Sequence, residues 1–399
     1  MRLMRTLHEA KIVATHVSKQ WQAEPRRLRA GRAQRGLFDA QHAAIHTEAP
    51  PHCIERLRHR EALNVAYTFA MFDAAPSNVS TRAEPALPQS DSPYTDLAPA
   101  RLWLPRASLT ACIRAVVARS SVGVALDEPQ RYNHFPAYPG CSIAWLFEGS
   151  VEMLEPGYAA HASSPRLDVP GRVYFCGPFT RPTITFNSPS AHGMMILLQP
   201  DAFSVITGKD SSEYLNRVVA ADTVFDGQWR EMFHAVQSAT DDDARVAILQ
   251  DFLQPRWALS RPKSLLGSHL LQDWFRGAAQ YFALSGLGRS LRQLERRFKR
   301  NTGLSMRELR SLTRSENAFY VAARESENGK LGAPRWADVA DEGGYADQSH
   351  MCRESRRVTG FSPEELYRLM CTEESFWMYR LWALTPAPQP TPKDRRYSQ

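Results

Sequence analysis

A short stretch of this chain reads LERRFKRNTGLS at residues 294–305, and a related stretch, MCRESRRVTGFS, follows it 57 residues later at residues 351–362. Each copy begins with an apolar residue and continues through several arginines to Thr-Gly, a second apolar residue and Ser. Glu-Leu follows at the same distance in both, as Glu308-Leu309 and Glu365-Leu366. So many shared features at one offset indicate a duplicated structural unit.

Each copy follows a short helical stretch and a glycine turn. Residues 277–285 and Gly286-Leu287-Gly288 precede the first copy, whereas residues 336–343 and Gly344 precede the second. Glycine readily adopts the positive φ that a tight turn requires. A helix, a tight turn and a second, basic helix form a helix-turn-helix unit, so the sequence predicts two of them.

The ends of both basic helices are marked in the sequence. Ser290 and Asp347 are residue types that cap the start of a helix through a side-chain oxygen. Thr302-Gly303 and Thr359-Gly360 place a glycine directly after the last turn, where the backbone commonly turns left-handed. We therefore expect helices of about three turns in both copies.

Each basic helix divides into an apolar stripe and a polar face. In the first helix, the spacing predicts that Leu291, Leu294 and Phe298 are buried; in the second, Met351 and Val358 are. The predicted outward faces consist of Arg292, Glu295, Arg296 and Lys299 in the first helix and Gln348, Ser349, Cys352, Arg353 and Arg356 in the second. A recognition helix needs this division, because one side docks on its own domain while the other meets base edges.

The charge distribution agrees with a nucleic-acid partner. The chain carries a net charge of +7, and residues 286–310 contain eight Arg or Lys and two Glu. Clustered basic residues neutralise DNA phosphates and release their counterions. A single basic helix is more simply interpreted as a solvated face, but a second copy behind a second glycine turn favours DNA binding.

These residues resemble the AraC/XylS family of bacterial transcription regulators. The first unit carries S-x-R-x-L-x-R-x-F-K at residues 290–299, and the second carries A-x-x-x-G-Y-x-D-x-S-x-M-x-R at residues 340–353. G-x-S and G-x-S-P follow them at residues 303–305 and 360–363. The match covers about residues 270–370.

The resemblance implies two helix-turn-helix units joined by a long helix at Met306–Arg324. It implies that each recognition helix enters a major groove of double-stranded DNA, one turn apart. The positions that would read base edges are Arg292, Glu295, Arg296, Gln348, Ser349, Cys352 and Arg353. Glu295 would accept a hydrogen bond from a cytosine amine.

Three positions depart from the family pattern. Ser355 stands where the family usually has a core Phe, which predicts a looser second unit. Met306 replaces the usual Pro, and the connection Glu325–Arg335 is longer than usual and rich in Gly, Asn and Lys. We expect this connection to be a flexible loop.

Residues 101–225 have a different pattern. After an expected short helix at Leu109–Arg119, apolar runs punctuated by Pro and Gly predict the strands Ser142–Phe147, Val151–Leu154, Arg172–Phe175, Thr183–Phe186 and Met194–Leu198. Such strands form a sandwich or a small, cupin-like barrel. Tyr132–Ala137, Gly177–Pro182 and Gln199–Phe203 weakly resemble the sensor domains of such regulators. Farther on, Trp229–Ser238 and Ala244–Leu253 have helical spacing, and Pro255 is expected to interrupt it.

No enzyme is expected, and neither a catalytic residue, a metal nor a cofactor is predicted. The chain has no G-x-S-x-G, P-loop or H-E-x-x-H motif, and His134, His161 and His192 stand alone. Trp145, Phe147, Tyr174 and Phe186 could line an aromatic pocket, although an ordinary core explains them more simply. The scattered cysteines, among them Cys141 and Cys176, are expected to be mainly buried, reduced thiols rather than oxidant sensors.

The predicted fold class is therefore α+β, a β-rich sensor domain followed by an all-α DNA-binding domain. The expected organisation is a partly disordered extension at 1–100, the β-rich sensor or dimerisation domain at 101–225 and a helical linker at 226–265. The double helix-turn-helix domain follows at 266–384, and a disordered tail at 385–399. Neither a signal peptide nor a membrane span is expected, so we predict a cytoplasmic protein.

The predicted function is a sequence-specific transcription regulator, most simply an activator that recruits RNA polymerase. A small-molecule effector or a homodimer contact would control it. Three alternatives stay open: a regulator that responds to no ligand, an enzyme domain fused to a DNA-binding tail, and a degenerate interaction protein that no longer binds DNA.

Overall fold

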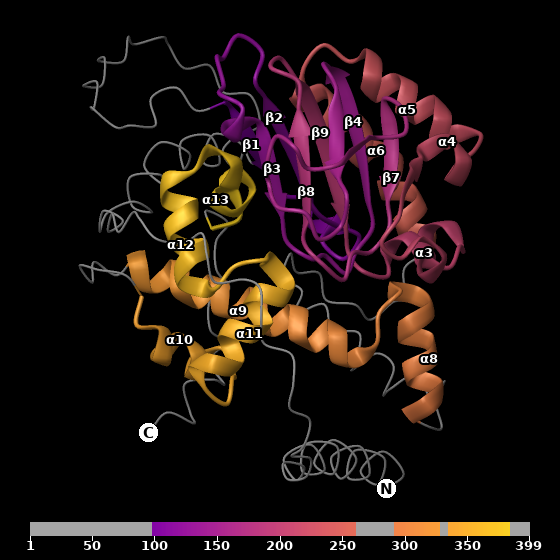
Figure 1. Ribbon diagram of the computed structural model, residues 1–399. Coiled ribbons are helices and arrows are strands. Elements are labelled where there is room, and N and C mark those ends of the chain that lie inside the picture. The colour runs from indigo at the N-terminus through magenta and orange to yellow at the C-terminus, as the bar shows by residue number, and fades with distance from the viewer. Residues whose placement is uncertain (1–97, 261–290, 328–333, 384–399) are drawn as a thin grey trace, which may run out of the picture. The chain divides into compact units, whose positions relative to one another are not determined.

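The computed structural model describes residues 98–260, 291–327 and 334–383. A β-rich region comes first and helices follow it, which confirms the predicted order (Figure 1). Some predictions lie outside the described residues: nearly all of the extension 1–100, the helix 277–285 with its glycine turn, the cap Ser290 and the tail 385–399.

The strands of the described residues form two antiparallel sheets. The six-stranded sheet has the order β1-β2-β9-β4-β7-β10, and the four-stranded sheet has the order β3-β8-β5-β6. Their bounds are β1 (Ala100–Trp103), β2 (Ile113–Ser120), β3 (Tyr132–Phe135), β4 (Ser142–Glu148), β5 (Val151–Leu154), β6 (Arg166–Asp168), β7 (Val173–Cys176), β8 (Thr183–Asn187), β9 (His192–Leu198) and β10 (Val218–Ala220). The five strands predicted from apolar runs are confirmed, each to within two residues at either end.

The predicted helix at residues 109–119 is wrong. A short 3-10 helix, η1 (Ala107–Leu109), ends there, and β2 follows as a strand between β1 and β9. Every residue of β2 except the last is buried, so buried and exposed residues do not alternate along it, and periodicity cannot separate it from a buried helix. The β-branched side chains of Ile113, Val116 and Val117 fit a pleated strand, and pairing on both sides fixes it.

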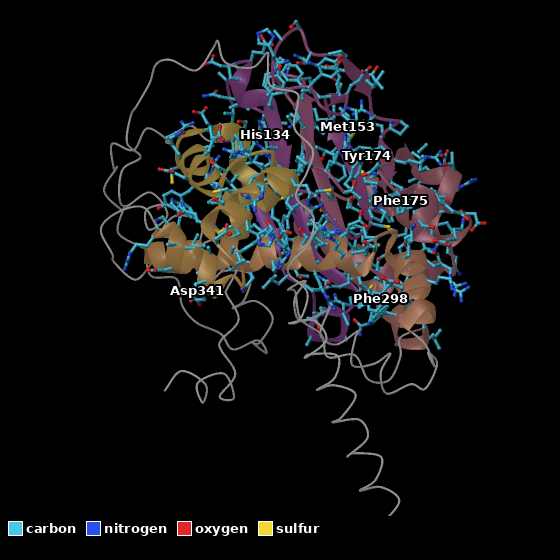
Figure 2. All side chains as sticks on the ribbon, turned by 60° about the horizontal axis from the view of Figure 1, so that its bottom comes forward. His134, Met153, Tyr174, Phe175, Phe298 and Asp341 are labelled. Carbon is cyan, nitrogen blue, oxygen red and sulfur yellow. The ribbon has the colours of Figure 1, made fainter. Side chains whose placement is uncertain are left out.

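Helices cover one face of the six-stranded sheet. They are α3 (Ala202–Thr207), α4 (Ala221–Val224), α5 (Gln228–Ser238) and α6 (Asp242–Ser260). Their apolar residues join one core with the sheet, in which Phe175, Trp145 and Leu249 are almost completely buried (Figure 2 labels Phe175). The helices of the predicted linker 226–265 therefore pack against the sheet.

The expectation that Pro255 interrupts the helical pattern is also wrong, because Pro255 lies inside α6. Proline removes one backbone hydrogen bond and strains the preceding turn. Leu253 and Trp257 flank it and are both buried in the core. Their burial on either side holds the helix across the proline.

The helical region consists of α8 (Leu291–Thr302), α9 (Met306–Glu327), α10 (Trp336–Glu342), α11 (Gln348–Thr359), α12 (Pro363–Thr372), η4 (Glu374–Phe376) and α13 (Trp377–Ala383). A helix is confirmed at Met306–Arg324, where α9 runs three residues farther than predicted. Residues 325–327 of the expected loop are thus helical, and residues 328–333 lie outside the described ranges. Within the described ranges, no helix combines the length and the apolar character that crossing a membrane requires.

We expect Leu249→Ala to lower the free energy of unfolding by about 2–5 kcal/mol, because it opens a cavity where α6 meets the sheet. Urea unfolding monitored by tryptophan fluorescence measures this. The matched control is Leu259→Ala on the same helix, whose side chain is 89% exposed. Equal effects of the two substitutions would contradict the packing of α6 on the sheet.

Candidate functional site

The start of α11 is built by a turn and a cap. Gly344 has a φ of 77°, which is the left-handed conformation predicted for the turn between α10 and α11. The carboxylate of Asp347 accepts a hydrogen bond from the backbone N–H of His350 at 2.6 Å, which confirms the predicted N-cap. Together they fix the direction in which α11 leaves the turn.

The two faces of α11 are as predicted. Met351 and Val358 are buried, and Met351 packs with residues of α9 and α10. On the opposite side, Gln348, Ser349, Arg353 and Arg356 are exposed, and Cys352 is partly exposed. The structure thus brings these predicted DNA-binding side chains onto one accessible surface.

α8 repeats this arrangement in the residues that are described. Phe298 is buried against α9, whereas Glu295, Arg296 and Lys299 are exposed (Figure 2 labels Phe298). The side chains of Leu291, Arg292 and Leu294 lie outside the described set. α8 therefore also presents acidic and basic groups on the side away from its apolar anchor.

Both basic helices end in the same way. The hydroxyl of Thr302 donates to the carbonyl of Phe298 at 2.7 Å, and that of Thr359 donates to the carbonyl of Ser355 at 2.8 Å. Gly303 and Gly360 follow with φ of 72° and 90°, as their predicted role as helix terminators requires. The duplicated sequence thus has a duplicated local structure.

The next helix also starts alike in both copies. Ser305 and Glu308 form a reciprocal cap at the start of α9: the N–H of Ser305 donates to the Glu308 carboxylate, and the N–H of Glu308 donates to the Ser305 hydroxyl. At the start of α12, the hydroxyl of Ser362 accepts from the N–H of Glu365. Met306, which departs from the family pattern, is simply the first residue of α9.

The C-terminal ends of both helices are attached to the β-rich region. The hydroxyl groups of Ser204 and Ser211 donate to the carbonyl of Asn301 near the end of α8, at 3.3 and 3.0 Å. Near the end of α11, the backbone N–H of Ala137 donates to the carbonyl of Val358 at 2.7 Å. These contacts hold the C-terminal ends of both helices against the β-rich region.

Ser355 occupies the position in the second copy that Phe298 occupies in the first. Its side chain is buried, and its hydroxyl donates to the carbonyl of Phe361 at 2.8 Å. A buried polar group that is hydrogen-bonded need not destabilise its surroundings. Ser355, which predicts a looser second unit, is thus hydrogen-bonded within that unit.

Two buried ion pairs link β2 to the helical region. Arg119 Nη2 lies 2.7 Å from Glu374 Oε1, and Arg380 Nη2 lies 2.9 Å from the other carboxylate oxygen. Arg114 pairs with Glu316 of α9. Burial lowers the pKa of Arg114 and of Arg119, and the Glu374 carboxylate opposes this at Arg119. Because each charge is buried, each depends on its partner.

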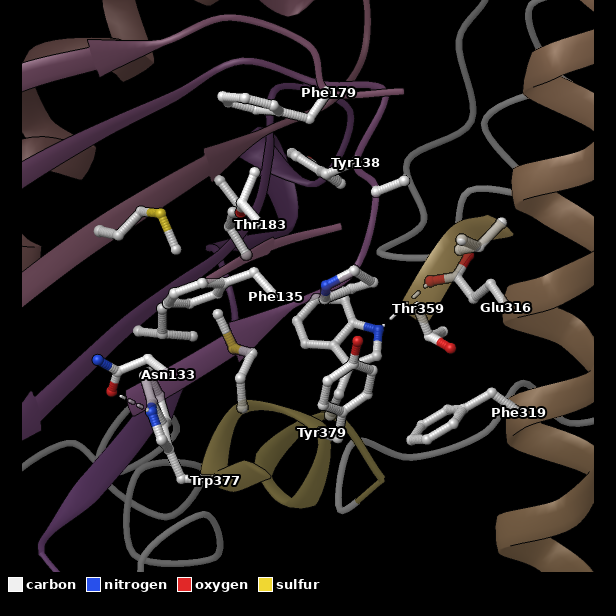
Figure 3. Close-up of a pocket in the computed structure, with 18 of the residues that line it drawn as sticks. Asn133, Phe135, Tyr138, Phe179, Thr183, Glu316, Phe319, Thr359, Trp377 and Tyr379 are labelled. Carbon is white, nitrogen blue, oxygen red and sulfur yellow. Dashed lines mark hydrogen bonds between the residues drawn. The ribbon is translucent and has the colours of Figure 1, made fainter. Parts of the chain in front are cut away.

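Aromatic and amide groups complete this interface. Asn133 of β3 accepts hydrogen bonds from Arg119 and, at 2.8 Å, from the indole N–H of Trp377 (Figure 3). His134, the next residue of β3, stacks on Phe376 with ring centroids 4.3 Å apart. Burial lowers the pKa of His134 to about 4, so the ring is neutral at neutral pH. His134 is thus a packed residue, and the described residues offer no cluster of three His, Cys, Asp or Glu that could hold a metal.

A cavity of about 270 Å³ is lined by residues of both sheets and of the helical region (Figure 3). Its walls are mainly apolar and aromatic, and they include Phe135 and Phe179 of the β-rich region with Phe319, Trp377 and Tyr379 of the helices. Of the four aromatic residues considered from sequence, Trp145 and Phe186 are buried core residues, and Phe147 packs against the core. Tyr174 is partly exposed, and Trp145 and Tyr174 both line this cavity. The expected burial of the thiols is confirmed for Cys112, Cys141, Cys176 and Cys371, and Cys53 lies outside the described residues.

Sequence reasoning missed Arg114, Arg119, Glu374 and Arg380, which join the two regions. Glu374 and Arg380 lie beyond the end of the recognisable repeat, where no motif marks them. Two arginines inside the apolar run of β2 were the available signal, because a charged residue is rarely buried without a partner.

No family model matches the chain, and no curated protein matches it. Among solved structures, an apo variant of ToxT from Vibrio cholerae strain SCE256 is 12% identical with a TM-score of 0.32, and the match covers 64% of this chain and 97% of that one. ToxT from Vibrio cholerae O395 bound to (E)-4-(8-methylnaphthalen-1-yl)but-3-enoic acid is 10% identical with a TM-score of 0.30, covering 61% and 96%. Unsaturated fatty acid bound wild-type ToxT is 12% identical with a TM-score of 0.28, covering 61% and 95%. All three TM-scores lie below 0.5.

We expect Glu374→Ala to lower the free energy of unfolding by about 3–5 kcal/mol, because it leaves Arg119 and Arg380 buried without their carboxylate. Urea unfolding measures this. The control is Asp338→Ala, which removes the exposed pair of Arg335 and Asp338 and should cost less than about 1 kcal/mol. A loss of under 1 kcal/mol for Glu374→Ala would show that the buried pair does not stabilise the interface.

Proposed function

We propose that the protein is a sequence-specific DNA-binding transcription regulator that reads two neighbouring major grooves with α8 and α11. One observation carries the proposal: two helices of related sequence expose polar and basic side chains, and the C-terminal ends of both bond to the β-rich region. On the other side, Phe298 in α8 and Met351 and Val358 in α11 are buried. In DNA-binding helix-turn-helix units the N-terminal residues of the second helix contact base edges. Gln348, Ser349, Cys352 and Arg353 hold those positions in α11.

In this proposal, α10, the turn at Gly344 and α11 form one helix-turn-helix unit. α8 is the recognition helix of the other unit, and α9 joins them. Arg292, Glu295 and Arg296 are the base-reading positions of α8. The resemblance of residues 270–370 to the AraC/XylS family supports this assignment. Lys299 and Arg356 contact phosphates, because they lie one to two turns farther along the exposed faces.

The proposed regulation uses the β-rich region as a sensor. Residues 101–225 and the helices that follow would bind a small effector or a second copy of the chain, and 266–384 would bind DNA in the cytoplasm. An effector must bind two arrangements of these regions with different affinity in order to shift promoter occupancy. The regulator would most simply act as an activator that recruits RNA polymerase.

Selection of bound sequences from a random DNA pool tests base reading directly. We expect a motif with two half-elements about one helical turn apart. Arg353→Ala should blur one half and Arg296→Ala the other, each by about 1–3 kcal/mol of discrimination. Arg172→Ala in the β-rich region removes an exposed arginine and is the charge-matched control, so it should leave the motif intact. Binding without any sequence preference would refute the proposal.

Lys299→Ala tests the proposed phosphate contacts. It should weaken binding by a similar factor on every DNA sequence and reduce the salt dependence of log K by about one unit of slope. Fluorescence anisotropy titrations between low and moderate salt measure both quantities. A loss confined to one base of the motif would instead assign Lys299 to base reading.

A further inference from the structure

The cavity wall contains a tyrosine hydroxyl group that has no hydrogen-bond partner among the described residues. Tyr379 of α13 is 4% exposed, and its hydroxyl has no hydrogen-bond partner among the described residues. Figure 3 shows the ring of Tyr379 in the cavity wall, with its hydroxyl directed toward the middle of the residues drawn. A buried hydroxyl without a hydrogen-bond partner costs free energy, so a ligand that accepts a hydrogen bond from it would recover that cost.

Two other hydroxyl groups of the wall already donate hydrogen bonds within the chain. The hydroxyl of Tyr138 donates to the carbonyl of Leu198, and that of Thr359 donates to the carbonyl of Ser355. The indole N–H of Trp145 also lacks a partner, but this ring packs against Phe233 in the core on the sheet's other face. Tyr379 is therefore the group best placed to orient a ligand.

The charges of the wall are compensated by the chain itself. Arg114 is paired with Glu316, and Arg119 with Glu374. Arg380 also contacts Glu374 and donates to the carbonyls of Met370 and Glu373 at the end of α12, where a helix is partially negative. Of these groups, Arg114, Arg119 and Glu316 line the cavity, and each is already paired within the chain. A charged ligand would lose its hydration in a mainly apolar cavity and compete with these pairs, whereas an uncharged one leaves both pairs intact.

The remaining unpartnered atoms of the paired arginines are donors as well. The Nε atoms of Arg114 and Arg119 are buried and have no acceptor among the described residues. Both residues line the cavity, although side chains at positions 114 and 119 would point to opposite faces of a regular strand. The register shift in the pairing of β2 with β9 between Ile113 and Ala115 accounts for this, because a bulge re-aims a side chain. The unpartnered groups of the cavity wall can therefore all donate a hydrogen bond to an acceptor atom of a ligand.

The second copy of the repeat makes room for the ligand. Ser355 lines the cavity where the first copy places the ring of Phe298 in its core. A cavity of roughly 150 Å³ holds a benzene molecule, so one of about 270 Å³ has room for about two aromatic rings. The apolar walls exclude a strongly hydrated compound.

The geometry points to an uncharged, mainly apolar effector of about two rings, held by a hydrogen bond from Tyr379 to one acceptor oxygen. This inference deepens the proposed function, because it names the effector class of the regulator. The sheet and the helices both contribute to the wall, so such a ligand contacts both regions at once.

Benzophenone is a suitable probe, because it has two rings and one carbonyl oxygen. Its isostere 1,1-diphenylethylene lacks the acceptor, and diphenylacetate carries a negative charge. Affinity is measured on the full chain without DNA by calorimetry or by the shift of the unfolding temperature. We expect benzophenone to bind about three- to tenfold more tightly than 1,1-diphenylethylene, and diphenylacetate to bind most weakly. Tighter binding of diphenylacetate than of benzophenone would overturn the inference.

Tyr379→Phe isolates the hydrogen bond. It should reduce benzophenone affinity to that of 1,1-diphenylethylene and leave the latter unchanged, without loss of stability, since the hydroxyl has no partner to lose. Tyr158→Phe, on a half-exposed loop tyrosine outside the cavity, is the matched control. An unchanged preference for benzophenone in Tyr379→Phe would refute the assignment.

Location is tested separately. Ultraviolet activation of bound benzophenone should attach it to side chains of the cavity wall, such as Met194 and Met195. Ser355→Phe, which restores the residue of the first copy, should abolish both the attachment and the affinity. Adducts confined to the outer surface would overturn the assignment of the ligand site to this cavity.

DNA titration of the same variants is an independent readout. Loss of DNA binding with intact Tyr379-dependent probe binding would reject the proposed regulator function and retain the ligand site.

Discussion

The carboxylate of Glu374 lies between Arg119 of β2 and Arg380 of α13, and the arrangement of the two regions depends on this buried contact. All three side chains are nearly inaccessible, so none can exchange its partner for water without exposing the interface. Arg114 and Glu316 repeat the principle at α9. Both pairs join β2 to helices that lie far from it in the sequence.

The residues of this interface are connected to the two proposed recognition helices through a few direct contacts. α9 carries Glu316 and also packs with Phe298 of α8 and Met351 of α11. The carbonyls of Asn301 and Val358 bond directly to the β-rich region. A change at the interface would therefore alter the relative position of α8 and α11.

Local features of the fold were predictable because they depend on few neighbouring residues. The cap at Asp347, the glycine turn at Gly344 and the helix ends at Gly303 and Gly360 follow from side-chain chemistry within one or two turns. The strand β2 was not predictable, since its identity depends on pairing with segments elsewhere in the chain. Periodicity also missed the continuation of α6 through Pro255, because the burial of Leu253 and Trp257 offsets the local penalty.

The candidate site likewise has one part that was predictable from the sequence and one part that was not. The exposed faces of α8 and α11 follow from helical spacing, so their accessible residues were assigned from sequence. The cavity and its ion pairs join β2 to residues about 200 and 255 positions away, and no local pattern records such a contact.

The difference between Phe298 and Ser355 connects these two parts of the molecule. A repeat whose only role was to bind DNA would gain stability from an aromatic residue in both cores. The second copy instead has a serine, and its hydroxyl bonds to the carbonyl of Phe361, so the polar group adds no unsatisfied burial. Thr359 and Gly360 still end α11 as their counterparts end α8, and the helix keeps its shape despite the lost ring. The departure is therefore compensated locally, and Ser355 lines the cavity. That combination is what a unit needs if it is to hold DNA and to respond to a molecule bound behind it.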